Sequence, residues 1–126
     1  MNTVIETMLS HRSIRQFKSD PIREEQLNAI IAAGISASSS SLLQVVSIIR
    51  VTDLAKRAKL VELSGNQAYV GSAAEFLVFC IDYQRHFEIN PHIQTECMEL
   101  TLIGAVDSGI MAQNCLLAAE SRGLGG

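Results

Sequence analysis

The segment His11-Arg12-Ser13-Ile14-Arg15 places two guanidinium groups, an imidazole and a hydroxyl within five positions. Arginine presents a planar fork of N–H donors that matches phosphate oxygens, and serine adds a short donor. The histidine ring can donate to a hydroxyl, a phosphate or a carbonyl. The segment therefore suits a phosphorylated small ligand. The alternative is an exposed basic turn whose arginines pair with nearby carboxylates, and the residue types alone favour that alternative.

Two other polar segments could line a binding site. Four consecutive serines, 38–41, could line a polar cavity, although such a run is more typical of a flexible linker. Gln67 belongs to the polar stretch 65–69, and its amide can donate and accept at once, as a heterocycle with carbonyl and N–H groups requires. A helix C-cap followed by a surface turn explains the same stretch equally well, so both interpretations remain open.

Several kinds of site are absent from the sequence. It contains no G-x-G-x-x-G fingerprint, no G-x-x-x-x-G-K-[ST] phosphate loop and no G-x-S-x-G nucleophile turn. Cys80, Cys97 and Cys115 are odd in number and lack C-x-x-C spacing, which argues against a disulfide framework or a metal site. His86 and His92 are expected in a solvated loop. No nucleophile–base pair stands out, so no catalytic side chain is assigned, and any redox reaction would need a cofactor.

Composition limits the class of protein. Apolar residues make up 48% of the 126 residues, which predicts a folded chain. Thirteen acids against ten bases give a net charge of −3, which argues against a nucleic-acid surface. Glu6, His11 and Arg12 interrupt any apolar run near the N-terminus, so no signal peptide is expected. We therefore expect a cytoplasmic protein.

Hydrophobic periodicity predicts alternating helices and strands. Two β-branched or apolar runs separated by a helix fit a parallel or mixed sheet with helices on its faces. The expected helices are 2–9, 23–35, 54–63 and 98–122, the expected strands are 45–51 and 74–82, and 86–97 is expected to be irregular.

The segment 98–122 is apolar nearly all round. A membrane span is the obvious alternative to a core helix, but Asp107, Gln113 and Asn114 lie near its middle and would be costly in lipid. Small residues recur along it at four-residue spacing: Gly104, Ser108 and Ala112. We predict a helix in a core or a subunit interface, with no membrane contact.

Taken together and in order, these segments resemble a known family. The opening 11–15, the blocks 38–44, 47–50 and 74–76, Gln67, and the stretch 107–126 are similar to the flavin-dependent nitroreductase superfamily. Within it, they are similar to the major oxygen-insensitive nitroreductase and NADPH-flavin reductase group. The resemblance runs from end to end of the chain without obvious gaps.

The resemblance implies an α+β, three-layer fold in which helices flank a central mixed sheet, and a homodimer with FMN at the subunit interface. The basic segment would then hold the FMN phosphate and ribityl chain, Gln67 would face the polar edge of the flavin ring, and the serines would reach the flavin of the other subunit. The long helix would be a central interface helix. The implied cofactor-binding residues are His11, Arg12, Ser13, Arg15, Ser39, Ser40, Ser41 and Gln67.

The implied activity is ping-pong hydride transfer from NADPH through FMN to free flavin, a nitroaromatic or a quinone. Flavin hand-over to a luciferase-type acceptor is a further implied partnership. Two alternatives remain: a protein that holds flavin without turnover, and a non-catalytic dimerisation fragment.

Family members are about twice as long as this chain. Residues 1–126 are therefore expected to be the N-terminal part of a single FMN-binding domain. By themselves, these residues are expected to retain FMN weakly or not at all.

Overall fold

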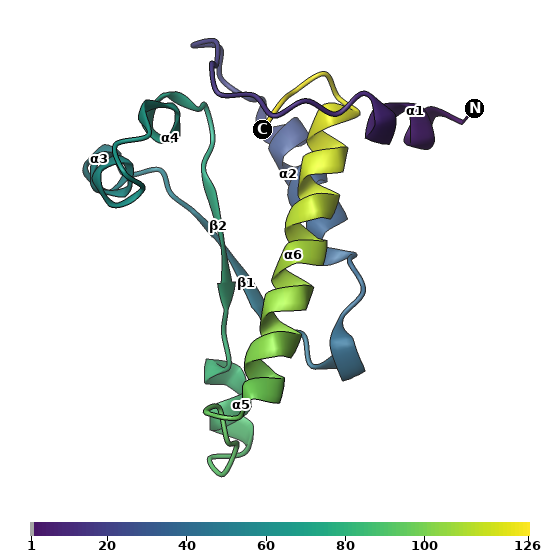
Figure 1. Ribbon diagram of the computed structural model, residues 1–126, viewed down its shortest axis with the longest axis vertical. Coiled ribbons are helices and arrows are strands. Elements are labelled where there is room, and N and C mark those ends of the chain that lie inside the picture. Colours follow the sequence, from purple (N-terminus) through teal and green to yellow (C-terminus); the bar gives the residue numbers. More distant parts are fainter. Residues whose placement is uncertain (1) are drawn as a thin grey trace.

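The computed structural model describes residues 2–126, in which one long helix, α6, runs between a short β-ribbon and helix α2 (Figure 1). The elements in chain order are α1 (Thr3–Leu9), α2 (Glu24–Ile35), the 3₁₀ turn η1 (Ser40–Leu42), β1 (Val46–Arg50), α3 (Leu54–Leu63), α4 (Ala68–Ser72), β2 (Leu77–Ile81), α5 (Gln84–Ile89) and α6 (Met98–Glu120).

The two strands form an antiparallel pair, with Val46 opposite Ile81 and Arg50 opposite Leu77. The sequence allowed a parallel or a mixed sheet, and a parallel arrangement is wrong for this pair. The reason lies in the connection, because α3 and α4 pack against each other beyond one end of the strands instead of crossing a sheet face (Figure 1). The chain therefore returns beside β1 in the opposite direction.

Arg57 on α3 holds this connection together. Its side chain is buried, and its Nε and Nη2 donate to the carbonyl of Val70 at 3.0 and 2.8 Å. Nη2 also donates to the carbonyl of Ala73 at 2.6 Å, and the guanidinium lies 5.3 Å from the ring centre of Phe76. A short helix can persist here because the carbonyls at its C-terminal end have a charged donor. The sequence analysis left residues 65–69 open between a polar stretch at a binding site and a surface turn, and it missed α4.

Close packing at glycines places α6 against its neighbours. A Cβ atom on Gly34 of α2 would overlap the Sγ of Cys115, and one on Gly104 would overlap the side chain of Ile81 in β2. Both glycines are therefore required by contact rather than by backbone conformation. Of the small residues spaced four apart on this helix, Gly104 thus accommodates a strand of the same chain.

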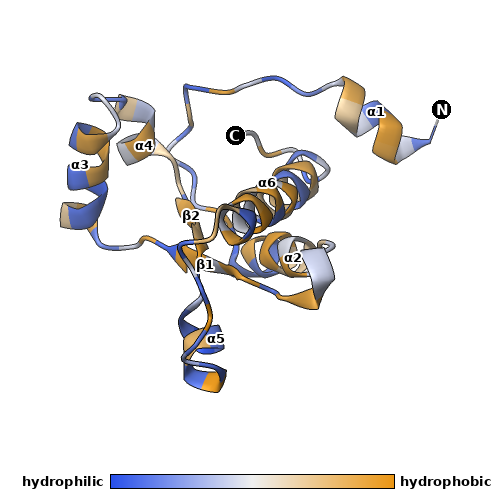
Figure 2. Cartoon of the chain, turned by 60° about the horizontal axis from the view of Figure 1, so that its bottom comes forward, coloured by the Kyte–Doolittle hydropathy of each residue, from blue (hydrophilic) through white to orange (hydrophobic). Residues whose placement is uncertain are grey.

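By length and composition, α6 could also cross a membrane, with a mean hydropathy of 1.3 over its most apolar window. Core helices of globular proteins pass the same test. Figure 2 shows apolar residues on several faces of α6, interrupted by polar ones. In this structure it packs against α2 and both strands, and it buries Asp107. Only 17% of that window is buried within residues 2–126, so packing inside one chain covers part of α6 and leaves the rest exposed.

Most expected elements are present with similar bounds. β2 is shorter than expected, because residues 74–76 precede the ladder. The segment predicted as irregular begins inside α5, which the sequence analysis missed. His86 is half-buried on α5 with its Nε2 2.7 Å from the carbonyl of Leu43, so its assignment to a solvated loop is wrong. His92 lies exposed in an irregular turn, as expected.

Candidate functional site

The basic segment 11–15 is extended and crosses the C-terminal end of α6 (Figure 1). Two contacts attach it there. The Nδ1 of His11 lies 2.5 Å from the Oε1 of Glu120, and the amide of Ile14 donates to the carbonyl of Gly126 at 2.9 Å. The position of the segment is therefore set by residues more than a hundred positions further along the chain.

The two arginines of this segment have no carboxylate partner within residues 2–126. The Nη1 of Arg12 donates to the carbonyl of His11 at 2.7 Å, and the Nη1 of Arg15 donates to that of Ile14 at 2.9 Å. The remaining guanidinium donors are left for other acceptors. Within residues 2–126, therefore, no carboxylate neutralises these arginines as the basic-turn interpretation requires, and Ser13 beside them is exposed.

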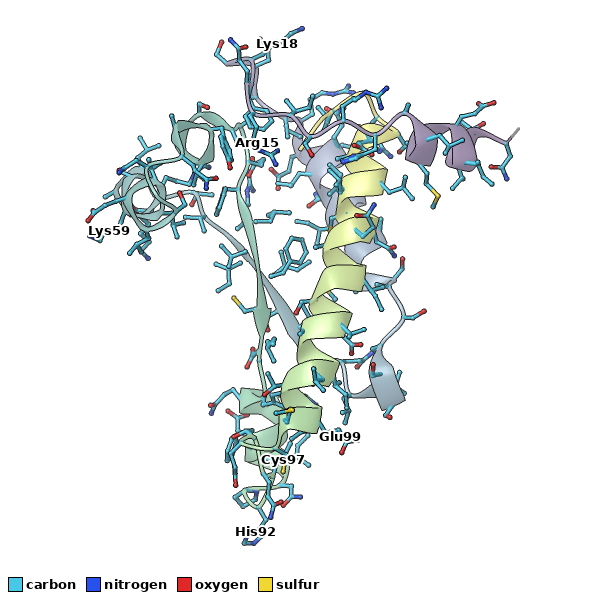
Figure 3. The ribbon with its side chains drawn as sticks, in the orientation of Figure 1. Arg15, Lys18, Lys59, His92, Cys97 and Glu99 are labelled. Carbon is cyan, nitrogen blue, oxygen red and sulfur yellow. The ribbon has the colours of Figure 1, made fainter. Side chains whose placement is uncertain are left out.

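Arg15 connects the basic segment to α4. Its guanidinium lies 5.1 Å from the ring centre of Tyr69, between α4 and the end of α6 (Figure 3). Gln67 is the exposed N-cap of the same helix, and its side chain makes no capping hydrogen bond. Arg15 and Tyr69 also line a hollow of about 660 Å³, whose wall includes residues 123–126. That volume lies within the usual range for small-molecule sites.

The serine segment is fixed rather than free. The amide of Ser40 lies 3.1 and 3.0 Å from the Oδ1 and Oδ2 of Asp107, and the Ser40 hydroxyl donates to Oδ1 at 2.7 Å. Asp107 is only 3% exposed. The flexible-linker interpretation of residues 38–41 is therefore wrong, because a buried carboxylate holds the middle of the segment.

The two groups of candidate residues lie at different points along α6. The basic segment is attached at Glu120 and the serine segment at Asp107, thirteen residues earlier, which corresponds to roughly 20 Å of helix. Within one chain, the basic segment lies near α4, whereas the serine segment lies near neither the basic segment nor α4.

The chain matches the family model described as "Nitroreductase family" over residues 8–126. It belongs to the nitroreductase family. This nitroreductase chain is 71% identical over its whole length to the NADPH-flavin oxidoreductase of Vibrio harveyi, and 53% identical to the oxygen-insensitive NADPH nitroreductase of Salmonella typhimurium. In each case it covers 52% of the relative.

Solved structures agree with the assignment of fold. The nitroreductase A of Vibrio parahaemolyticus superimposes with a TM-score of 0.97 at 70% identity, over 99% of this chain and 53% of that one. The α+β nitroreductase fold expected from the resemblance is confirmed. The chain spans about half the length of the curated relatives it matches.

The sequence analysis did not identify three residues that contact the candidate segments: Tyr69, Asp107 and Glu120. Tyr69 gave no signal beyond its closeness to Gln67. Asp107 and Glu120 gave a stronger signal in the sequence. Apart from Glu99 in the first turn, they are the only acidic residues on the apolar helix α6. An acid on such a helix needs a partner, and in both cases the partner belongs to a candidate segment.

Other titratable groups of the nitroreductase chain have structural roles. A hydrogen bond from the Ser47 hydroxyl at 2.6 Å, together with one from the amide of Gln84, lowers the pKa of Asp82. Burial raises the pKa of the Cys115 thiol, so this sulfur is held in the unreactive protonated form. No group of histidines, cysteines and acids within residues 2–126 could hold a metal ion.

Proposed function

We propose that residues 1–126 form the N-terminal part of a single FMN-binding domain, and that the whole protein is an FMN-dependent NADPH oxidoreductase. The observation that carries this proposal is the basic segment, whose Arg12 and Arg15 have no carboxylate partner within residues 2–126 and whose Arg15 lines a hollow of about 660 Å³. The V. harveyi and S. typhimurium relatives are named for NADPH-dependent flavin and nitro reduction, which supports the same activity.

The residues present fit the cofactor. His11, Arg12, Ser13 and Arg15 would bind its phosphate and ribityl chain, because they offer a dense set of donors on an exposed extended segment. Gln67 would face the ring edge, since its side-chain amide is free to donate and accept. When bound, FMN would supply hydride chemistry from NADPH to free flavin, nitroaromatics or quinones. The chain's own part is to bind and orient the cofactor, and we assign no catalytic side chain.

We further propose a homodimer in which the serine segment, Ser39, Ser40 and Ser41, reaches the flavin of the second copy, with the Ser40 hydroxyl held by Asp107 and those of Ser39 and Ser41 left to face the flavin. The separation of roughly 20 Å along α6 supports this arrangement, because one chain does not unite the two groups. The exposed apolar face of α6 supports it as well: Leu102, Val106 and Ile110 are 57%, 56% and 39% exposed.

The whole protein is proposed to act in the cytoplasm, on small molecules, without nucleic-acid or membrane partners. The net charge of −3 supports the first exclusion, and the packing of α6 supports the second. Flavin hand-over to a luciferase-type acceptor is the one partnership with a different protein that we propose.

The deciding experiment is a visible absorption spectrum of the purified protein before and after anaerobic addition of NADPH. Flavin bands that bleach are the expected result. Bands that remain would favour a flavin-holding protein, and a colourless dimer that FMN does not restore would favour a dimerisation fragment. Residues 1–126 alone are expected to retain FMN weakly or not at all, and an FMN affinity equal to that of a full-length relative would contradict this expectation.

The phosphate assignment has its own test. Arg15→Gln is expected to weaken binding of FMN but to leave binding of riboflavin, which lacks the phosphate, nearly unchanged. Lys56→Gln on α3 is the matched control, because it removes an exposed cation away from the hollow. Equal losses for FMN and riboflavin would assign Arg15 a different role.

A further inference from the structure

Asp107 is an unusual residue for its surroundings. It lies in the middle of the apolar helix α6 and is only 3% exposed. Burial of a carboxylate is costly unless hydrogen bonds compensate for the lost water. Within residues 2–126 its partners are the amide and the hydroxyl of one residue, Ser40. The buried carboxylate of Asp107 therefore fixes the position of the serine segment through Ser40.

The segment that follows Ser40 has a strained backbone. Ser41, Leu42 and Gln44 have φ angles of 51°, 54° and 55°, in the left-handed region that favours glycine. A non-glycine residue keeps this conformation only where the surrounding structure enforces it.

Contacts at both ends enforce this conformation. Asp107 holds the start of the segment at Ser40. At the other end, the carbonyl of Leu43 accepts from the ring of His86 at 2.7 Å, and the carbonyl of Gln44 accepts from the Nη2 of Arg85 at 2.6 Å. A linker that only joins two elements requires no such fixation.

The serine hydroxyls are used unequally. The Ser40 hydroxyl is taken up by Asp107, whereas those of Ser39 and Ser41 form no hydrogen bond to any other residue in 2–126. Ser41 is exposed and Ser39 is half-exposed. Fixing the central serine thus presents its two neighbours to an external acceptor or donor.

We propose that Asp107 is a positioning residue, which holds the serine segment in the conformation that binds the flavin of a second copy. This inference rests on the proposed function. Asp107 touches neither cofactor nor substrate, and it acts through Ser40. Removal of the negative charge of Asp107 should therefore weaken the binding of the flavin that is held by the other subunit of the dimer.

The first measurement is the dissociation constant for FMN in the homodimer. Asp107→Asn keeps the shape of the side chain but replaces one acceptor oxygen by a donor that faces the Ser40 amide, so we expect roughly tenfold weaker binding. Ser40→Ala removes one of three hydrogen bonds and should weaken binding less. Glu99→Gln is the matched control on the same helix, because Glu99 is exposed, and it should bind FMN as the unmodified protein does.

Mixed dimers separate positioning in the other subunit from general damage. A subunit with Asp107→Asn is paired with one that carries Arg12→Gln and Arg15→Gln, with a different affinity tag on each. One site then combines an intact basic segment with an intact serine segment, and the other site lacks both. We expect mixed dimers to hold half the FMN of unmodified dimers, at a concentration that leaves both parent dimers largely empty.

Mixed dimers that bind no better than their parents would overturn the inference, as would unchanged binding by Asp107→Asn. If Asp107→Asn does not fold, Ser40→Ala serves in the same pairing. Unmodified dimers without FMN would overturn the proposed function itself, so the two failures are distinguishable.

Discussion

Glu120 accepts a hydrogen bond from the ring of His11 across 109 positions of sequence, with 2.5 Å between Oε1 and Nδ1. Because a carboxylate only accepts, Nδ1 carries the hydrogen, and Nε2 is left to face a ligand. An acid in the last turn of a helix opposes the helix dipole, and here it also lies beside the proposed phosphate site. The hydrogen bond that orients the ring of His11 explains why Glu120 is nevertheless found at this position.

The contact between Glu120 and His11 predicts different effects on FMN binding for two substitutions of Glu120. Glu120→Ala should weaken FMN binding several-fold because His11 loses its orientation, whereas Glu120→Gln should bind nearly normally because its carbonyl oxygen still accepts. Fluorescence titration with FMN measures both. If repulsion of the phosphate dominates, both variants will instead bind more tightly. In a His11→Ala background, Glu120→Ala should have no further effect.

Replacement of Arg57 by Met should lower the free energy of unfolding by about 3 kcal/mol, because the carbonyls of Val70 and Ala73 lose their charged donor. Denaturation in urea measures the loss, and hydrogen exchange should show that amides of α4 open first. Lys59→Met on the same helix breaks only the exposed pair with Glu62 and should cost less than about 0.5 kcal/mol. Similar losses for the two variants would contradict the role given to Arg57.

The contact between α2 and α6 predicts a rescue. Gly34→Ala should destabilise the protein by about 2 kcal/mol, because the added methyl group overlaps the Sγ of Cys115. Cys115→Ala removes that sulfur, so the double variant should be more stable than Gly34→Ala alone. Thermal unfolding of the three variants completes the cycle. A purely additive result would show that the clash is relieved elsewhere.

Asp82 should contribute to loss of stability in acid. Its folded-state pKa is lowered, first by the Ser47 hydroxyl and then by the Gln84 amide. The stabilisation is therefore complete above the unfolded pKa of about 3.9 and is lost as the pH falls through the lower folded value. Asp82→Asn should flatten the dependence of unfolding free energy on pH below about 4. A profile parallel to that of the unmodified protein would exclude Asp82 as a contributor.

Local patterns predicted much of this chain. The predicted helix 54–63 is present as α3, which begins after Asp53, whose side chain accepts from the Lys56 amide, and is followed by Gly65 with a φ of 78°. The donors of the basic segment could be named from residue types. That the arginines have no carboxylate partner within residues 2–126 could not be predicted, because it depends on where acidic residues far away in the sequence lie in the fold.

Long-range partners were beyond the reach of local pattern. Asp107 was recognised as a polar residue on an apolar helix, but its partner Ser40 is 67 positions away. α4 has only five residues and depends on Arg57 from another helix, so no periodicity marks it. The direction of β2 follows from how α3 and α4 pack, which is a tertiary property.

The connection through α3 and α4 also has a consequence for how quickly the chain folds. Arg50 and Glu75, which pair across the end of the ribbon at 2.7 Å, are 25 positions apart, so the strands meet only after a sizeable loop has closed. Closure of such a loop costs conformational entropy, and the first hydrogen bonds between β1 and β2 do not offset this cost. The contacts of Arg57 with the carbonyls of Val70 and Ala73 span only 13 and 16 positions, so they close a shorter loop than the ribbon does. We therefore expect Arg57 to affect the rate at which the ribbon forms as well as its final stability.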